Sequence, residues 1–282
     1  MSSAQETPVR NALPAIDKSV CVVFVVWGAE YVDLALRASR SEHLREFDKL
    51  LITDRETPVD TNDEISLLRV DFELVNNARK AEISRHLPQR WTNFILLDSD
   101  TVVLGDLALG VEKALRHGIA MAPANTYLLE QYPRVETVMQ REGIQPRGQI
   151  QYNAGVVFFS TSYPGVKAVL DLWLQLCKRY SEAKYAWSGD QPYLNLALEL
   201  SEFSTYCLSR NYNYRPSSIP IQGIVRVWHS TDTVPGNINS EPSKWRRFNS
   251  RLGVFENMRS PKSSRHRIMR WFKFLKSKCL GI

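Results

Sequence analysis

The sequence predicts an α/β fold in which helices flank a largely parallel central sheet. Short apolar runs of strand length alternate with segments of helical spacing along most of the 282 residues, which is the pattern of repeated strand–helix–strand units. Neither an internal repeat nor a low-complexity linker interrupts residues 19–255, so this range is expected to form one domain. The hydrophobic content of 44% is ordinary for a soluble globular protein.

Eight segments have the length and the apolar character of buried strands. The first is rich in valine, the second contains Leu50-Leu51-Ile52, and the sixth reads Asn-Ala-Gly-Val-Val-Phe-Phe-Ser. The fourth ends in two carboxylates, at the kind of strand end where ligands bind in open parallel sheets. The predicted strands are residues 19–27, 48–53, 66–72, 91–98, 118–123, 153–160, 203–208 and 223–229.

Five segments between these strands have helical spacing. In the first, Leu34, Ala35 and Ala38 fall on one side. The second stops ahead of Pro88, because the residue before a proline is disfavoured in a helix. The predicted helices are residues 31–41, 76–86, 111–117, 165–180 and 190–200.

Residues 1–18 are predicted to be a flexible leader. They are polar and lack the basic start and apolar centre of a signal peptide, which indicates a cytoplasmic protein. No apolar stretch reaches the roughly 18 residues of a membrane span, so no transmembrane helix is expected. The four cysteines form no CxxC pair, and we expect reduced thiols rather than a zinc site or disulfides.

Residues 256–282 are predicted to be a basic amphipathic tail. No acidic residue follows Glu256, whereas eight basic ones do, and the other 28 bases of the chain face 30 acids. The body is therefore close to neutral, which argues against nucleic-acid binding. Drawn as a helix, residues 265–280 place apolar side chains opposite a row of Arg and Lys, which is typical of a helix on an anionic membrane surface. The alternatives for residues 259–282 are a helix docked on the body and a disordered basic end.

The sequence Asp98-Ser99-Asp100 is the main candidate for a functional site. It follows the apolar run of residues 94–97, and two acids at a buried strand end are costly unless their charge is compensated. The carboxylates can accept hydrogen bonds in a turn, bind a divalent cation that holds a nucleotide-sugar diphosphate, or serve a haloacid dehalogenase-like phosphatase, whose DxDxT motif the residues also fit. That phosphatase needs a later GDxxxD motif, but Gly189-Asp190 is followed by Gln-Pro-Tyr-Leu-Asn. The phosphatase is therefore the runner-up.

An ordered series of segments carries a resemblance to a known enzyme family. The chain resembles a GT-A glycosyltransferase over roughly residues 20–230 and is most similar to glycosyltransferase family 8, which includes glycogenin and bacterial lipooligosaccharide galactosyltransferases. The segments are Arg79-Lys80 with Leu87-Pro88, the DxD segment FILLDSDTVVLGDL at 94–107, YNAGVVF at 152–158, Gly189-Asp190-Gln191 and Trp228-His229.

The resemblance implies a GT-A catalytic domain over residues 19–255 with a metal site. Its ligands would be Asp98, Asp100 and His229, and two carboxylates with an imidazole suit Mn²⁺, with Mg²⁺ as the alternative. A core histidine, a solvated lysine and a helix N-cap are the ordinary interpretations of His229, Lys80 and Asp190-Gln191. The other implied site residues are Tyr31 at the nucleobase, Lys80 near the sugar or phosphates, Asn153 and Gly155 in the donor-sugar pocket, and Asp190 and Gln191 at the transferred sugar.

Two segments depart from the family pattern. Residues 27–30 read Trp-Gly-Ala-Glu where members often have polar residues, which leaves the nucleobase open. After His229, Asp232 and Pro235 stand at the Gly and Lys places of HxxGxxK. The phosphate contacts are therefore expected to be supplied by other residues.

The predicted function is metal-dependent transfer of a hexose from a nucleotide-diphosphate sugar. A UDP-sugar is the expected donor, and a glycan or lipid-linked glycan of polysaccharide or lipopolysaccharide biosynthesis is the expected acceptor. The resemblance implies retention at the anomeric carbon. The enzyme is expected on the cytoplasmic face of a membrane, which it would contact through residues 259–282. The alternative outside enzymes is a non-catalytic, membrane-associated nucleotide-sugar-binding protein.

Overall fold

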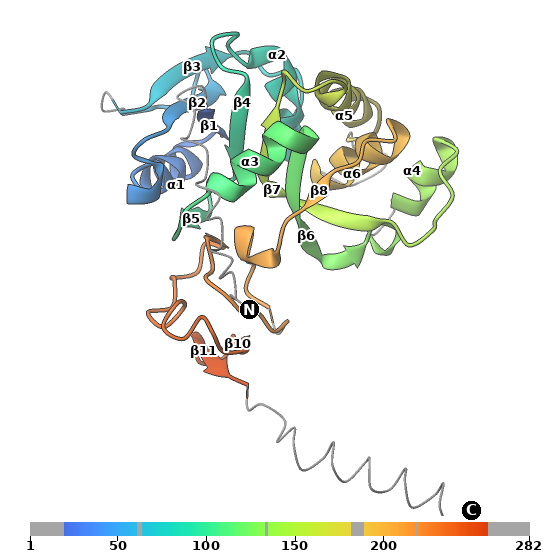
Figure 1. Cartoon of the computed structure of the whole chain (residues 1–282). Helices are drawn as coiled ribbons and strands as arrows, with labels where there is room; N and C mark the ends of the chain where they lie inside the picture. The colour runs from blue at the N-terminus through green and yellow to red at the C-terminus, as the bar shows by residue number, and fades with distance from the viewer. Residues whose placement is uncertain (1–19, 61–63, 133–134, 182–188, 218, 259–282) are drawn as a thin grey trace, which may run out of the picture. The chain divides into compact units, whose positions relative to one another are not determined.

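A computed structural model describes residues 20–60, 64–132, 135–181, 189–217 and 219–258 (Figure 1). By its internal contacts the chain divides into two compact units. The expected single domain thus spans the first unit and part of the second, while the predicted leader and the basic tail of residues 259–282 lie outside the described residues. The described parts are residues 20–60, 64–132, 135–181, 189–215 and 225–232 in the first unit, and residues 216–217, 219–224 and 233–258 in the second.

A seven-stranded sheet forms the centre of the first unit. Only β7 runs against the other strands, because its pairings with β4 and β6 are antiparallel and every other pairing is parallel. The mostly parallel sheet predicted from the sequence is therefore confirmed. The strand order is β3 (Ser66–Val70), β2 (Asp48–Asp54), β1 (Val20–Val25), β4 (Asn93–Leu97), β7 (Ile150–Ser160), β6 (Ile119–Leu128) and β8 (Tyr206–Cys207).

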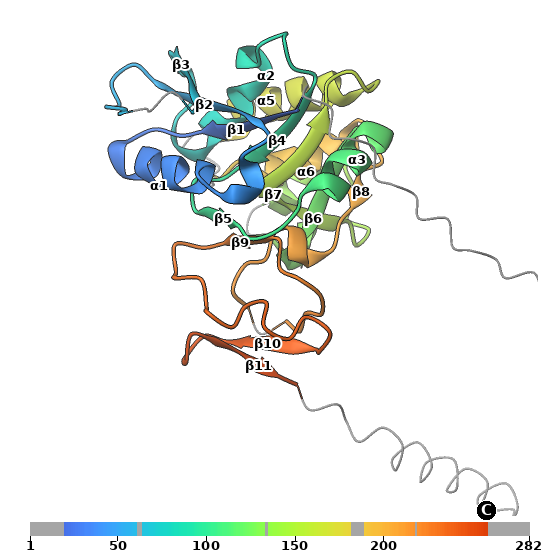
Figure 2. The ribbon, with the colours of Figure 1, turned by 60° about the vertical axis from the view of Figure 1, so that its left-hand side comes forward.

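Helices cover both faces of this sheet (Figure 2). In β1, Cys21 and Val23 join one apolar cluster, and Val22 and Phe24 join the other. Strands that are buried on both faces read as continuous apolar runs, which is why the sequence pattern identifies them. The first cluster also contains side chains of α5 (Val166–Tyr180) and α6 (Gln191–Leu200), and the second contains side chains of α1 (Ala29–Ser39) and α3 (Ala108–His117).

A two-stranded ladder joins two distant segments of the first unit. The strand β5 (Thr101–Val103) pairs antiparallel with β9 (Val227–His229), so that Thr101 lies opposite His229. The sequence predicts a longer strand over 223–229 and no strand at β5, because a three-residue strand carries too short a pattern to detect. This ladder brings the end of the acidic segment to the late histidine.

Short and irregular segments differ most from the predicted elements. The predicted helix over 76–86 is a 3₁₀ helix, η2 (Asn76–Glu82), followed by α2 (Ile83–His86). The Glu82 carboxylate accepts hydrogen bonds from the backbone N–H groups of Glu73 and Leu74, at 3.1 and 2.7 Å, and fixes the chain ahead of η2. Besides the short strands, four short helical elements were not predicted: η1 (Glu42–Leu44), η3 (Leu129–Gln131), α4 (Val135–Arg141) and η4 (Arg210–Tyr212).

The second unit contains an antiparallel hairpin of β10 (Arg246–Asn249) and β11 (Val254–Asn257). Phe248 lies opposite Phe255, and both rings are buried. The guanidinium of Arg246 is also buried and donates hydrogen bonds to the carbonyls of Ile238 and Gly223. A charged residue at an inward position breaks the apolar alternation, so the hairpin has no clear signal in the sequence.

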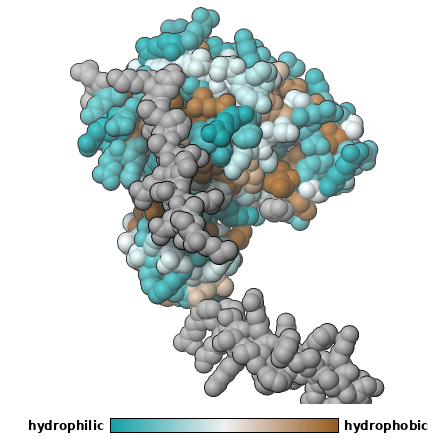
Figure 3. All heavy atoms as spheres, in the orientation of Figure 1, coloured by the Kyte–Doolittle hydropathy of each residue, from teal (hydrophilic) through white to brown (hydrophobic). Residues whose placement is uncertain are grey.

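The described surface visible in Figure 3 is largely hydrophilic, with scattered apolar areas. None of the helices in the described ranges is both long and apolar enough to span a membrane. Cys21, Cys177 and Cys207 are free thiols, of which the first two are buried and Cys207 is exposed, and Cys279 lies outside the described residues.

Candidate functional site

The candidate site begins where β4 ends. The backbone N–H of Asp98 donates to the Gly155 carbonyl on β7 at 2.8 Å, which fixes the first residue after the strand. The Asp98 carbonyl accepts hydrogen bonds from the backbone N–H and the hydroxyl of Thr101, at 3.2 and 2.7 Å. The carbonyl of Asp100 accepts a bond from the Ser230 N–H at 2.9 Å. Both acids are therefore held by backbone bonds to neighbouring strands.

The ring of His229 faces both carboxylates. Its Nε2 lies 3.2 Å from Asp100 Oδ1 and 3.5 Å from Asp98 Oδ2. One ligand atom of each of the three residues lies within 4.8 Å of the others. The histidine is buried, whereas the acids are partly open to solvent. Three groups that each offer a lone pair thus converge on one point, and together they can hold a divalent cation.

The surroundings of Asp100 keep its carboxyl ionised. Burial opposes ionisation, but when no cation is bound the hydrogen bond from a protonated His229 and its charge, followed by the charge of Arg215, lower the pKa of Asp100 below its usual value. An ionised carboxylate is the form that binds a cation.

Gly155 leaves the space that this cluster needs. A Cβ at this position would lie 2.0 Å from His229 Cε1 and 2.7 Å from Asp98 Oδ2. Both distances are far below van der Waals contact, so any side chain here would displace the imidazole or the carboxylate. The position therefore favours glycine for close packing against His229.

Lys80 forms a buried ion-pair cluster beside the acids. Its Nζ lies 2.7 Å from Asp98 Oδ1 and 3.1 Å from Asp190 Oδ2, and only 7% of the lysine is exposed. Burial lowers the pKa of Lys80, but Asp190 and Asp98 outweigh this effect and raise it above its usual value. Burial raises the pKa of Asp190, and Lys80 opposes this rise. Lys80 is therefore a permanently charged bridge between the end of β4 and the start of α6.

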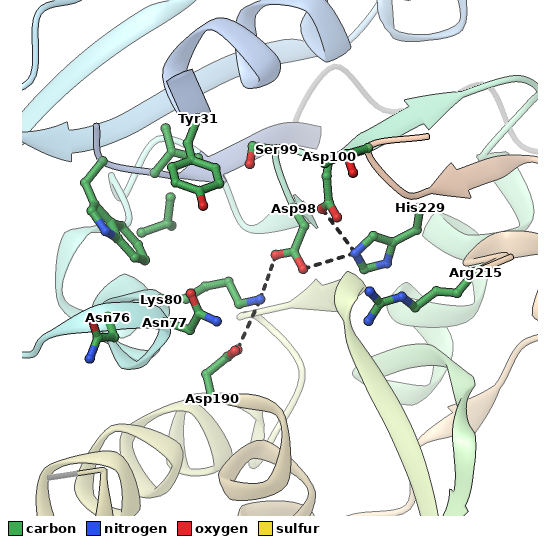
Figure 4. Close-up of a pocket in the computed structure, with 14 residues that line it drawn as sticks. Tyr31, Asn76, Asn77, Lys80, Asp98, Ser99, Asp100, Asp190, Arg215 and His229 are labelled. Atoms are coloured by element: carbon green, nitrogen blue, oxygen red, sulfur yellow. Dashed lines mark hydrogen bonds and ion pairs between the residues drawn. The ribbon is translucent and has the colours of Figure 1, made fainter. Parts of the chain in front are cut away.

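A pocket of about 740 Å³ opens beside these groups (Figure 4). Three predicted site residues, Asn153, Gly155 and Gln191, are not among the described residues that line it. Asn153 bonds to Asn213, and Gln191 Oε1 accepts a hydrogen bond from the Ala154 N–H at 3.3 Å. The predicted residues that do line the pocket are Tyr31, Lys80, Asp98, Asp100, Asp190 and His229.

The side of the pocket next to β1 is aromatic. Tyr31 is 52% exposed, and Trp27 lines the wall beside it. The guanidinium of Arg79 lies 5.1 Å from the centre of the Trp27 ring and pairs with Asp54 at 3.1 Å, which holds that ring in place. An exposed ring on a fixed wall can stack on a flat heterocycle.

Sequence reasoning missed four residues of this region. Asn76 and Asn77 line the pocket just before the Arg79-Lys80 segment, and that proximity was the available signal. Arg215 also lines the pocket, and Figure 4 shows its side chain extending from the His229 side. Asn213 bonds to the ring of His229 at 2.7 Å. The last two precede β9 and belong to no motif, so the sequence gives no signal for them.

The mostly parallel sheet flanked by helices is shared with solved glycosyltransferases, which supports the GT-A fold that the sequence predicted. The galactosyltransferase LgtC in complex with donor and acceptor sugar analogues aligns with a TM-score of 0.53 at 14% identity, over 76% of this chain and 88% of that one. The glycosyltransferase GlyE of Streptococcus pneumoniae TIGR4 aligns with a TM-score of 0.51 at 17% identity, over 80% of this chain and 57% of that one.

At these identities the likeness to solved structures establishes the fold. The predicted resemblance is confirmed at that level. The sequence matches no protein-family model, and no curated protein matches it either.

Proposed function

We propose that the chain is a metal-dependent glycosyltransferase that moves a hexose from a nucleotide-diphosphate sugar to a glycan or lipid-linked glycan. The observation that carries the proposal is the convergence of Asp98, Asp100 and His229 at the edge of a pocket. The shared fold adds support, because LgtC was crystallised with donor and acceptor sugar analogues. The donor proposed here is a UDP-sugar.

The proposed cofactor is Mn²⁺, with Mg²⁺ as the alternative. The fit rests on the donor set, because two carboxylates and an imidazole offer mixed oxygen and nitrogen ligands. Asp98, Asp100 and His229 would hold the ion. When bound, it would supply Lewis-acid stabilisation of the negative charge on the leaving diphosphate.

The charges of the pocket give Arg215 a separate role. The lining residues include three carboxylates and two cations, Lys80 and Arg215. Lys80 already pairs with Asp98 and Asp190, whereas no described residue makes a hydrogen bond or ion pair with the Arg215 guanidinium. We assign Arg215 to the diphosphate, whose charge grows when the sugar leaves. This assignment supplies a phosphate contact where the sequence departs from HxxGxxK.

Tyr31 is proposed to stack on the nucleobase, and Asp190 and Gln191 are proposed to lie beside the transferred sugar. Lys80 would hold the carboxylates of Asp98 and Asp190 in place beside the donor. Retention of the anomeric configuration, implied by the family resemblance, is part of the same proposal. Proton NMR of the first-formed product tests it, because an inverted anomer would contradict retention.

The test of the main proposal is metal-dependent release of UDP from a panel of UDP-sugars. We expect release with Mn²⁺, none after chelation, and none from Asp100→Asn. The matched control is Asp71→Asn, which removes an exposed carboxylate that pairs with Arg55. Release that persists in Asp100→Asn or without metal would contradict the mechanism. Phosphate release from p-nitrophenyl phosphate instead of UDP release would favour the phosphatase.

Residues 259–282 are proposed to bind the enzyme to an anionic membrane surface on the cytoplasmic side. The segment has eight basic residues and no acidic one, and each base near such a surface contributes on the order of 1 kcal/mol. Removal of 259–282 should abolish sedimentation with phosphatidylserine vesicles and leave donor hydrolysis intact. Equal sedimentation of the full and shortened chains would refute the membrane contact.

A further inference from the structure

The ring of His229 has a second nitrogen, which faces away from the carboxylates. Its Nδ1 lies 2.7 Å from Asn213 Oδ1, and Asn213 Nδ2 donates to Asn153 Oδ1 at 2.7 Å. Asn153 Oδ1 also accepts a hydrogen bond from the Gly155 backbone N–H at 2.8 Å. His229, Asn213 and Asn153 are each only 3% exposed, so this chain of bonds is shielded from water.

The backbone at one end of the chain fixes the direction of every bond in it. A backbone N–H can only donate, so the Asn153 atom that faces Gly155 must be the carbonyl oxygen. The Asn213 atom that meets the same oxygen must then be the amide nitrogen, which turns the Asn213 carbonyl toward His229. A carbonyl oxygen can only accept, and Nδ1 of His229 therefore carries a hydrogen.

The consequence falls on Nε2. In a neutral imidazole only one nitrogen carries a hydrogen, so a hydrogen on Nδ1 leaves a lone pair on Nε2. That lone pair faces Asp98 and Asp100, whose oxygens also only accept. Three acceptors that face one another need a proton or a cation between them.

Backbone bonds hold Asn213 beside the histidine. The N–H of Tyr214 donates to the Val227 carbonyl at 2.9 Å, and the N–H of His229 donates to the Tyr214 carbonyl at 3.0 Å. Tyr214, the residue next to Asn213, is thus bonded to β9 through both its N–H and its carbonyl group. The two side chains keep their relative position because their backbones are joined.

We propose that Asn213, oriented by Asn153, is a positioning residue that holds His229 in the Nδ1–H tautomer and so presents Nε2 to the metal. The proposal rests on the proposed metal site. Partners of this kind on the far nitrogen of a metal-binding histidine typically change metal affinity by about 10–100-fold. Asn213 and Asn153 thus belong to the metal site without touching the metal.

The first test measures the Mn²⁺ affinity of the full chain, without donor, from the electron paramagnetic resonance signal of free Mn²⁺. We expect Asn213→Leu to weaken binding by roughly 10–100-fold, because leucine has no acceptor for the Nδ1 hydrogen. Asn195→Leu is the matched control: Asn195 is also 3% exposed and bonds to the Tyr152 backbone, but it makes no bond to His229. The control should bind Mn²⁺ as the unmodified protein does.

A conservative variant separates tautomer control from packing. Asn213→Asp keeps an acceptor for Nδ1 but loses the donor to Asn153, as Asn213→Leu also does. We expect Asn213→Asp to keep the affinity that Asn213→Leu loses. Equal weakening in both variants, or no weakening in Asn213→Leu, would overturn the positioning role.

A second measurement needs no variant of Asn213. In the Mg²⁺-loaded protein with ¹⁵N-labelled histidine, the ring signals missing from His229→Gln belong to His229. Two-bond ¹H–¹⁵N correlations should show a hydrogen on Nδ1 and none on Nε2, and the opposite pattern would overturn the proposal.

If the unmodified protein and His229→Ala bind Mn²⁺ equally, the metal site itself is wrong and the proposal falls with it. If Asn213→Leu keeps full Mn²⁺ affinity while His229→Ala loses it, the metal site stands and the proposal alone fails.

Discussion

Replacing Lys80 with methionine should destabilise the first unit through its buried acids. Methionine has a similar length but no charge, so Asp190, which is only 5% exposed, would lose the partner that lies 3.1 Å away. Removing one partner of a buried ion pair typically costs about 3–5 kcal/mol, because the remaining charge stays buried. Asp98 adds little to this loss because 28% of its side chain is exposed and solvent screens it. We therefore expect a loss of about 3 kcal/mol at neutral pH.

The loss should shrink as the pH falls. Burial already raises the pKa of Asp190, and Lys80 restrains that rise, so removing Lys80 should raise the pKa further. An acid whose pKa is higher in the folded state binds its proton more tightly there, so the free energy of unfolding falls as pH rises from the unfolded pKa through the folded one. Lys80→Met should thus approach the stability of the unmodified protein near pH 4, about the unfolded pKa of aspartate.

Urea unfolding followed by circular dichroism at two pH values provides the assay. Lys178→Met is the matched control, because Lys178 pairs with Glu73 at the surface, where their side chains are 35% and 57% exposed, and its loss should cost no more than about 1 kcal/mol. Adding Asp190→Asn to Lys80→Met should recover part of the loss, since the orphaned charge is gone. A loss no larger than that of the control, or the same at both pH values, would refute the buried-charge reasoning.

Three substitutions in and beside the metal site test the effects of its geometry and of its charges on ligand binding. Gly155→Ala should weaken Mn²⁺ binding in a calorimetric titration, because its Cβ would displace the His229 ring, and unchanged affinity would contradict the close approach. Arg215→Gln should weaken UDP binding in the presence of Mn²⁺ by about tenfold or more, the worth of a charge-assisted hydrogen bond, while Arg226→Gln, which bonds to a backbone carbonyl, should not. Asp100→Asn should abolish the rise in Tm that Mn²⁺ gives the unmodified protein, and a persistent rise would place the ion elsewhere.

The central sheet was predictable because its strands carry their own pattern. The strands β1, β4 and β7 are buried on both faces, so their sequences are nearly continuous apolar runs. The strand β5 is only three residues long, and the inward residue Arg246 in β10 is charged. Such elements exist because tertiary contacts complete them, and a local pattern does not contain that information.

The same distinction applies within the candidate site. Asp98 and Asp100 were predictable because acids at the end of an apolar strand are conspicuous. The sequence linked His229 to them only through a family resemblance, since the β5–β9 ladder that joins them crosses more than a hundred residues of chain. Asn213 is an ordinary amide in a loop sequence, and nothing near it marks its contact with His229. The residues that hold metal ligands in place are therefore harder to predict than the ligands.

The charges in the pocket show how a cation and a diphosphate would balance its three acids. Asp98, Asp100 and Asp190 bring three negative charges to one end of the sheet, and Lys80 compensates only one of them. A divalent cation at His229 would balance the other two, whereas a proton between His229 and these acids offsets only one of them. Arg215 would then be the surplus positive charge of the loaded pocket, and a diphosphate is the kind of ligand that such a surplus attracts. On this account the cation and the diphosphate should each strengthen the binding of the other, because each offsets the charge that the other brings.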